Sequence, residues 1–361
     1  MIVMRQTYQR RPLFVILLCS FLICTLWVFT GQERPAWRPV ADPERYHSRR
    51  VAKATMLYGK PNPLYERAID SHGRHARRWG YPMHVLRQDI SVGFWNKPIY
   101  LASLMIQEMA KPPAERVEWL MWVDADTILI NAAVPLEAFL PPYDISEDVH
   151  LVATRDHNGL NTGIMFLHVH PWTIKFLIEA LGHPLYKPDV DLDHSVDLDH
   201  SIDQEAMARV LSNSNGGFNG TSYAEGAMFL PRTWINAYEW RHAYEGTRGN
   251  ILVHFPGLGD QRWVHMSNWL DVVELSPHSW EMPFEETEYY NGTVAFWDRI
   301  REAKETIRIA EHRFNRLSTV KGKAPMEAAV RELKKVLQQE ADDTELLIQR
   351  LQDLKSVMDL S

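Results

Sequence analysis

Two aspartates and a histidine stand at the ends of apolar segments and could together hold a metal ion. Asp124 and Asp126 close one apolar run, in the order Trp-Val-Asp-Ala-Asp-Thr, and His254 closes another, with Gly257 and Gly259 after it. Carboxylates suit a hard divalent cation that neutralises a diphosphate, and a neutral imidazole suits Mn²⁺. Glycines let the backbone approach a phosphate closely. The combination predicts a metal site for a diphosphate-containing substrate.

An Asp-x-Asp triplet is weak evidence alone, because this chain also has one at 189–191, at 191–193 and at 197–199. The last two lie in a duplicated acidic segment, 191–203, that is more typical of a solvated surface loop. Only the pair at 124–126 ends a strand-like apolar run. A single histidine at a strand end is more often structural, so the site hypothesis depends on the combination.

Short apolar segments alternate with amphipathic ones through the middle of the chain. We expect strands at 54–59, 81–87, 117–126, 150–156, 162–169 and 251–255, and helices at 63–79, 97–109, 171–181 and 203–211. This alternation is typical of an α/β fold with a mostly parallel sheet flanked by helices. Ligands of such folds gather at the carboxyl ends of strands, where the acid pair and the histidine would lie.

The N-terminal segment is predicted to anchor the chain in a membrane. Residues 13–30 are mostly apolar, and as a helix they would span roughly 27 Å, close to the thickness of a bilayer core. Because basic residues cluster upstream, we expect a cytosolic tail at 1–11, a transmembrane anchor at 12–31, a stem at 32–52 and a lumenal remainder. A cleaved signal peptide is the alternative, although no small-x-small site ends the run.

The remaining composition limits the organisation further. The formal net charge of −7 gives no reason to expect a nucleic-acid partner, and both cysteines, Cys19 and Cys24, fall in the expected anchor. We expect one globular domain over 53–296 and a charged helical tail over 297–361. That tail could be a coiled coil that joins subunits into a homo- or hetero-oligomer, or a helical hairpin packed on the preceding domain.

Six segments, in order, resemble the fungal Golgi α-galactosyltransferase and α-1,6-mannosyltransferase family, which also contains plant xyloglucan xylosyltransferases. They are FWNKPIYL, EWLMWVDADTILIN, NGLNTGIMFL, IDQEAMARVL, PRTWINAY and VHFPG, between about Thr55 and Asp271. The resemblance implies a retaining, Mn²⁺-dependent type II Golgi membrane enzyme with a GT-A fold. It also implies a nucleotide-sugar donor, UDP-galactose or GDP-mannose, and a mannose-containing glycan acceptor.

The resemblance also assigns roles to single residues. Asp124, Asp126 and His254 would bind the metal, with Asp124 also facing the donor ribose, and Gly257 would approach the phosphates. Donor-sugar contacts would come from Asn161 and Gly163, and a donor-side or structural contact from Lys97. Asp203 and Gln204 would lie on the face of the sugar opposite the leaving group. Asp203 could attack C1 covalently, or donor and acceptor could meet on one face, the route that we favour.

The sequence departs from the family pattern where Ile202 replaces an acid, Leu258 replaces a cysteine, and His168 and Val169 replace Arg-Asn. These changes bear on donor and acceptor choice more than on the reaction. Asn219 and Asn291 begin Asn-Gly-Thr sequons and are predicted glycosylation sites. Two alternative functions stay open, a metal-dependent hydrolase and a non-catalytic subunit of a Golgi mannan polymerase.

Overall fold

The computed structural model describes residues 49–186, 202–213, 222–315 and 320–359. The expected anchor at 12–31, the duplicated acidic segment up to residue 201, and Asn219 lie outside these ranges. Among the described helices, none combines the length and the apolar character needed to cross a membrane.

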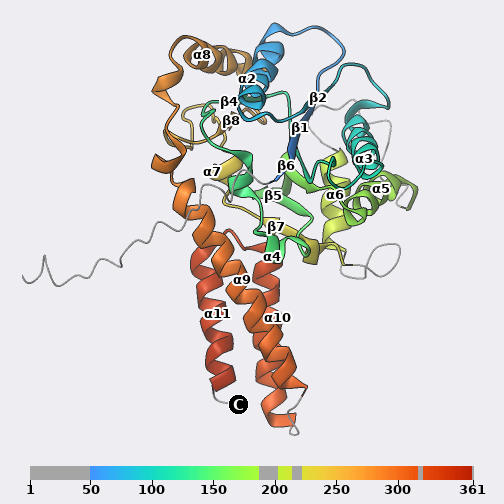
Figure 1. Ribbon diagram of the computed structural model, residues 1–361, viewed down its shortest axis with the longest axis vertical. Helices are drawn as coiled ribbons and strands as arrows, with labels where there is room; N and C mark the ends of the chain where they lie inside the picture. Colours follow the sequence, from blue (N-terminus) through green and yellow to red (C-terminus); the bar gives the residue numbers. More distant parts are fainter. Residues whose placement is uncertain (1–48, 187–201, 214–221, 316–319, 360–361) are drawn as a thin grey trace, which may run out of the picture. The chain divides into compact units, whose positions relative to one another are not determined.

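A six-stranded sheet forms the centre of the described fold, with the strand order β2-β1-β3-β6-β5-β7. Its strands are β1 (Val51–Met56), β2 (Met83–Leu86), β3 (Trp119–Val123), β5 (Leu151–Asp156), β6 (Gly159–His168) and β7 (Ala227–Phe229). β1 pairs in parallel with β2 and β3, β5 pairs in parallel with β7, and β6 runs antiparallel to both β3 and β5. The expectation of a mostly parallel sheet is confirmed, with β6 as the reversed strand (Figure 1).

The strand that carries His254 does not join this sheet. β8 (Leu252–His254) pairs instead with β4 (Thr127–Leu129) in a separate two-stranded antiparallel sheet. Because β4 begins directly after the Asp-Ala-Asp turn, the register sets Thr127 opposite His254. The β4–β8 pairing therefore brings His254 next to the turn that carries Asp124 and Asp126.

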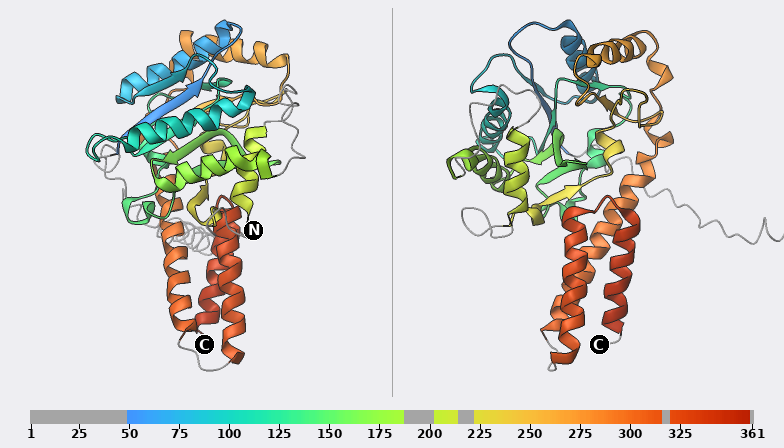
Figure 2. Two further views of the ribbon diagram at one scale, coloured as in Figure 1. Left: turned by 90° about the vertical axis from the view of Figure 1, so that its right-hand side faces the viewer. Right: turned by 180° about the vertical axis from the view of Figure 1, so that it is seen from behind.

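Helices cover both faces of the central sheet (Figure 2). The helices of this region are α2 (Pro63–Trp79), α3 (Asn96–Met109), α4 (Tyr143–Ser146), α5 (Pro171–Tyr186), α6 (Ile202–Ser212), α7 (Arg232–Ile235) and α8 (Gln261–Leu275). In β3, Leu120 and Trp122 pack in one core cluster with α3, α5 and α6, whereas Trp119, Met121 and Val123 pack in the cluster on the other face. Successive side chains of a strand point to opposite faces, so a strand covered on both sides is apolar throughout.

The start and the end of α2 agree with the expectation from sequence because its local signals are strong. Asn62 caps the first turn by accepting from the backbone N–H groups of Leu64 and Tyr65, and Gly80 ends the helix with a left-handed φ of 75°.

The C-terminal helices pack on their own chain. α9 (Tyr289–Phe314), α10 (Val320–Gln339) and α11 (Thr344–Asp359) lie side by side, and α10 also contacts β7, the edge strand of the sheet (Figure 1). The apolar positions expected on one helical face, among them Leu347, Leu351 and Leu354, are buried in the core cluster that also holds Val123. The three helices thus bury apolar positions within the chain, and α10 covers part of the sheet edge at β7. A role of the tail in joining subunits stays a prediction.

Candidate metal and nucleotide-sugar site

The residues predicted to bind a metal converge. One ligand atom from each of Asp124, Asp126 and His254 lies within 4.8 Å of the others, and His254 Nε2 is 3.4 Å from Asp126 Oδ1. Two residues follow the end of β3 and one ends β8, so the β4–β8 pairing positions all three. Two carboxylates and an imidazole form a donor set that fits a divalent cation of the Mn²⁺ class.

A hydrogen-bond network fixes which nitrogen of His254 is available. Its Nδ1 lies 2.7 Å from Oδ1 of the fully buried Asn236. The Asn236 amide nitrogen donates to Asn161 Oδ1 at 2.9 Å and to Thr154 Oγ1 at 2.8 Å, which fixes the orientation of this amide. An amide oxygen only accepts, so Nδ1 carries the proton of His254. The lone pair of Nε2 then points to the acid pair, as in histidines that ligate metals.

The same network positions Asn161 and Gly163, the two residues expected beside the donor sugar. Asn161 Oδ1 accepts from the Gly163 N–H at 2.9 Å, and the Asn161 amide nitrogen donates to Tyr238 at 2.7 Å and to Asp156 at 3.0 Å. A Cβ on Gly163 would lie 2.5 Å from His254 Cε1, so the imidazole needs a glycine there. The structure therefore gives Gly163 a steric role in the metal site.

Lys97 lies between Asp124, a predicted metal ligand, and Asp203, a predicted catalytic residue. Its ammonium group is buried, 3.1 Å from Asp124 Oδ1 and 3.2 Å from Asp203 Oδ2. Burial by itself lowers the pKa of Lys97, but the two carboxylates outweigh it and raise the pKa, so this residue is a permanent cation. Burial raises the pKa of Asp124 despite the nearby lysine, and the Trp122 indole N–H donates to its Oδ1 at 2.7 Å.

Asp203 and Gln204 lie in the first turn of α6, facing β6. Asp203 is fully buried, and apart from its pairing with Lys97 its oxygens have no hydrogen-bond partner within the described ranges. A buried carboxylate with an unused acceptor is suited to a substrate hydroxyl or a developing positive charge. Gln204 Oε1 accepts from the backbone N–H of Thr162 at 2.9 Å, which holds this side chain against β6.

Arg262 is a site residue that sequence reasoning did not identify. It follows the glycines after His254, in the first turn of α8, and its guanidinium lies 3.4 Å from Asp126 Oδ2 and donates to the Tyr65 hydroxyl at 3.0 Å. Its buried Nε has no partner among the residues that the structure describes. Burial opposes ionisation of Asp126, but the neighbouring side chains of His254 and Arg262 outweigh it and lower the pKa of that carboxyl. The arginine thus adds a cation beside Asp126.

Asn236 and Tyr238 were also missed as individual site residues, although both lie in the segment PRTWINAY that carries the family resemblance. Tyr238 packs its ring against His254, with centroids 5.4 Å apart, and donates through its hydroxyl to Asp156 at 2.8 Å. Because a side chain that orients a ligand leaves no mark of its own in the sequence, only the motif could have pointed to these residues.

A buried cluster of Lys53, His72 and His75 contacts the turn that carries Asp124 and Asp126 through Thr127. Lys53 Nζ lies 2.9 Å from His72 Nδ1 and 3.3 Å from His75 Nδ1, and burial lowers the pKa of all three groups. His72 Nε2 in turn lies 2.9 Å from Thr127 Oγ1, which donates to the Asp124 carbonyl at 2.6 Å. The cluster thereby fixes the backbone that carries the acid pair.

The other predicted site residues are less closely tied to the cluster. Gly257 adopts a left-handed φ of 66°, which favours glycine, in the loop between His254 and α8. Asn291 is exposed in the first turn of α9, but the hydroxyl of Thr293 in its sequon is buried and donates to the Tyr289 carbonyl. Glycosylation at Asn291 stays a prediction.

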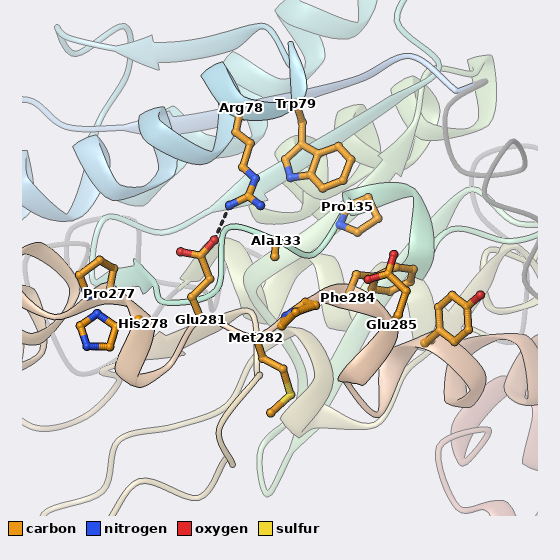
Figure 3. A pocket seen from close by; sticks show the side chains of 12 residues that line it. Arg78, Trp79, Ala133, Pro135, Pro277, His278, Glu281, Met282, Phe284 and Glu285 are labelled. Carbon is orange, nitrogen blue, oxygen red and sulfur yellow. Dashed lines mark hydrogen bonds and ion pairs between the residues drawn. The ribbon is translucent and has the colours of Figure 1, made fainter.

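A separate cavity of about 600 Å³ lies where the end of α2 meets the segment before α9. Figure 3 shows Arg78 paired with Glu281 across it, with Trp79, Pro135 and Phe284 to one side. No residue of the metal cluster lines this cavity, so it is a separate feature of the molecule.

Comparisons with known proteins identify a family and several relatives that this chain resembles. Residues 138–262 match the sequence model of the galactosyl transferase GMA12/MNN10 family. The chain is 23% identical over 228 residues to an alpha-1,2-galactosyltransferase of Schizosaccharomyces pombe, covering 54% of this chain and 56% of that protein. It is 28% identical over 205 residues to Probable glycosyltransferase 3 of Oryza sativa subsp. indica, covering 49% of this chain and 38% of that protein.

The chain thus spans about half, or less, of the length of the curated relatives that it matches. Among solved structures it is similar to a glycosyltransferase involved in the glycosylation of the major capsid of PBCV-1. That similarity has a TM-score of 0.45 and 12% identity, over 60% of this chain and 98% of the other. The resemblance expected from the sequence motifs is confirmed by the family match, in which residues 138–262 are similar to the galactosyl transferase GMA12/MNN10 family.

Proposed function

We propose that this chain is a metal-dependent glycosyltransferase that transfers a hexose, galactose or mannose, from a nucleotide-sugar donor to a mannose-containing glycan. One observation carries the proposal beside the family match. His254 is oriented by Asn236 and presents Nε2 to Asp126, one of the two acids in the turn between β3 and β4. The GT-A fold, expected from the resemblance, fits the mostly parallel sheet and the acid pair that follows β3.

The diphosphate of the donor lies, in this proposal, between the acid pair and the start of α8. Asp124, Asp126 and His254 hold a divalent cation, Mn²⁺ by preference, which supplies neutralisation of the leaving diphosphate. Arg262 donates to the phosphate oxygens from its half-buried guanidinium, and Gly257 gives them close access to the backbone. The divalent cation and Arg262 together offset the negative charge of the diphosphate leaving group.

The transferred sugar lies between β6 and α6. Asn161 and Gly163 border it on one side, and Asp203 and Gln204 border it on the other. Asp203 pairs with Lys97, and its carboxylate stabilises the positive charge that develops at the anomeric carbon. We favour transfer with retention in which donor and acceptor meet on one face, because full burial beside Lys97 suits Asp203 to electrostatic stabilisation more than to attack on C1.

We propose further that residues 12–31 anchor the protein in the Golgi membrane as a single-pass type II protein, with the site in the lumen. The basic cluster before the apolar run and the family resemblance support this topology. The two alternative functions have less support. The apolar face of the C-terminal helices is buried within the chain, so it does not by itself indicate a partner subunit. The hydrolase alternative differs in needing no acceptor site.

Thermal stabilisation of the full chain in detergent tests the proposal. UDP-galactose and GDP-mannose are each added with and without Mn²⁺, because a ligand that binds only the native state raises the unfolding midpoint. We expect one donor to raise the midpoint only with Mn²⁺, and Asp126→Asn to abolish this shift. Asp271→Asn, which changes an exposed acid paired with Arg67, is the matched control and should keep the shift. A wild-type chain that neither donor stabilises would refute the proposal.

A further inference from the structure

An exposed tryptophan lies next to the proposed donor site. Trp240 retains 42% of its surface exposed, and among the described residues it is the one tryptophan in this exposed class. It is nevertheless tightly held. Its Nε1 donates to Glu245 Oε2 at 3.0 Å, its ring meets the Tyr238 ring edge-on at 5.3 Å between centroids, and the Arg232 guanidinium lies 5.9 Å from its centroid. The indole is therefore exposed and also pre-positioned.

The partners of this tryptophan connect it to the metal cluster. The Tyr238 ring that packs on Trp240 also packs on His254, and its hydroxyl contacts Asn161 beside the donor sugar. The backbone also joins the two segments. Tyr238 forms an isolated β-bridge with His254, and the Glu239 N–H donates to the His254 carbonyl at 2.8 Å. Trp240 thus packs on Tyr238, which itself contacts both His254 and Asn161.

A hollow of about 410 Å³ adjoins this segment. Its lining residues offer polar groups and no carboxylate: Arg241, His242, Gln261, Val264 and His265. Imidazole, amide and guanidinium groups in one hollow can donate hydrogen bonds to hydroxyls, and an aromatic face beside them can cover the C–H face of a sugar ring. No carboxylate of the described residues lines the hollow, and the Glu239 carboxylate next to it is paired with His265 Nδ1 at 3.1 Å.

From these contacts we propose that Trp240 is the aromatic platform of an acceptor subsite and that a neutral hexopyranose of the acceptor glycan packs on it. The adjoining hollow, next to the loop after His254, receives the hydroxyls or the next residue of that glycan. This inference rests on the proposed glycosyltransferase function, and it specifies where the acceptor enters. Because Glu245, Tyr238 and Arg232 already hold the indole, little side-chain entropy is lost on binding.

Steady-state kinetics of the full-length protein test the proposal. The acceptor probes are methyl α-D-mannopyranoside and a linear α-mannotriose, and the donor is whichever nucleotide sugar the wild type uses. Trp240→Ala should raise KM for mannotriose about tenfold, the equivalent of one aromatic contact. KM for the donor and the rate of donor hydrolysis without acceptor should stay within about twofold of wild type, because only a binding contact outside the donor pocket is lost.

Two further variants separate a platform from a structural role. Trp240→Phe keeps an aromatic face but loses the hydrogen bond to Glu245, and it should recover most of the acceptor affinity. Leu275→Ala removes an 80% exposed apolar side chain at the far end of α8 and should leave every constant unchanged. Saturation-transfer NMR with methyl α-D-mannopyranoside provides a direct binding readout that does not need turnover.

The outcomes are distinguishable. A raised acceptor KM with unchanged donor hydrolysis supports the subsite. Donor hydrolysis by the wild type together with an unchanged acceptor KM in Trp240→Ala overturns the subsite and leaves the proposed function standing. An equal rise of both KM values also overturns it, because the tryptophan would then shape the donor pocket. A wild type that consumes no donor overturns the proposed function and this inference together.

Discussion

Replacement of Asn236 by alanine should weaken metal binding although Asn236 is not a ligand. The substitution removes the oxygen that accepts the His254 Nδ1–H at 2.7 Å, so the imidazole loses the contact that fixes its tautomer and its orientation. Loss of such an outer partner costs about 10- to 100-fold in metal affinity, which corresponds to about 1.4 to 2.7 kcal/mol. Asn236→Asp keeps an acceptor for His254 but loses the N–H groups that donate to Asn161 and Thr154, so it should recover only part of this affinity.

A matched control separates this effect from general destabilisation. Asn250 is also buried, and its side chain donates to the Thr233 carbonyl at 3.0 Å and to the Tyr289 hydroxyl at 2.7 Å, outside the metal cluster. Alanine at either position leaves buried polar groups unpaired, at a cost of about 1–3 kcal/mol for each such group. Both variants should therefore unfold at lower denaturant concentration, but only Asn236→Ala should bind metal more weakly.

The assay is a titration of the folded protein with Mn²⁺, followed by calorimetry or by the electron paramagnetic resonance signal of the free ion. Urea unfolding of each variant establishes that the titrated protein is native. An unchanged Mn²⁺ affinity in Asn236→Ala, or an equal loss in Asn250→Ala, would refute the argument that the amide oxygen orients the ligand.

Three other outcomes are expected. Gly163→Ala should abolish donor turnover and weaken Mn²⁺ binding at least tenfold, because the new Cβ would lie 2.5 Å from His254 Cε1; normal Mn²⁺ binding and turnover would contradict the steric argument. Arg262→Met should raise KM for the donor about tenfold or more, since a charge-assisted phosphate contact is lost, while Arg262→Lys recovers part of it; kinetics that separate donor KM from acceptor KM provide the check. The stacked histidines His150 and His168 should make the fold acid-sensitive: burial and neighbouring histidines lower their pKa values to about 3 and about 4, so both are neutral in the native state. The stability that they contribute is complete above the unfolded-state pKa of about 6.5 and is lost as the pH falls towards the folded values. Urea unfolding at pH 7.5 and 4.5 should show that His168→Phe loses about 2 kcal/mol less than wild type between these values, and an identical loss in the variant would count against the assignment.

Much of the fold could be predicted because local signals are strong in this chain. Asn62 and Gly80 mark the ends of α2, and the continuous apolar run of β3 is what a strand covered on both faces requires. The reversed direction of β6 was not predicted, although the two residues between β5 and β6, with Gly159 after them, are a hairpin signal in the sequence. The apolar residues of β6 are equally compatible with parallel and antiparallel pairing, and the short connection from β5 to β6 decides the direction.

For the site, the sequence by itself determined the chemical groups: an acid pair at a strand end, a histidine before glycines, and an Asp-Gln pair that opens a helix. The tertiary structure alone decided how they act together. The β4–β8 pairing sets His254 opposite Thr127, the buried ammonium of Lys97 joins Asp124 to Asp203, and Asn236 selects the nitrogen of His254 that faces the acids. Those contacts join residues that are distant in the chain, and no local pattern encodes them, because each depends on the packing of several elements at once.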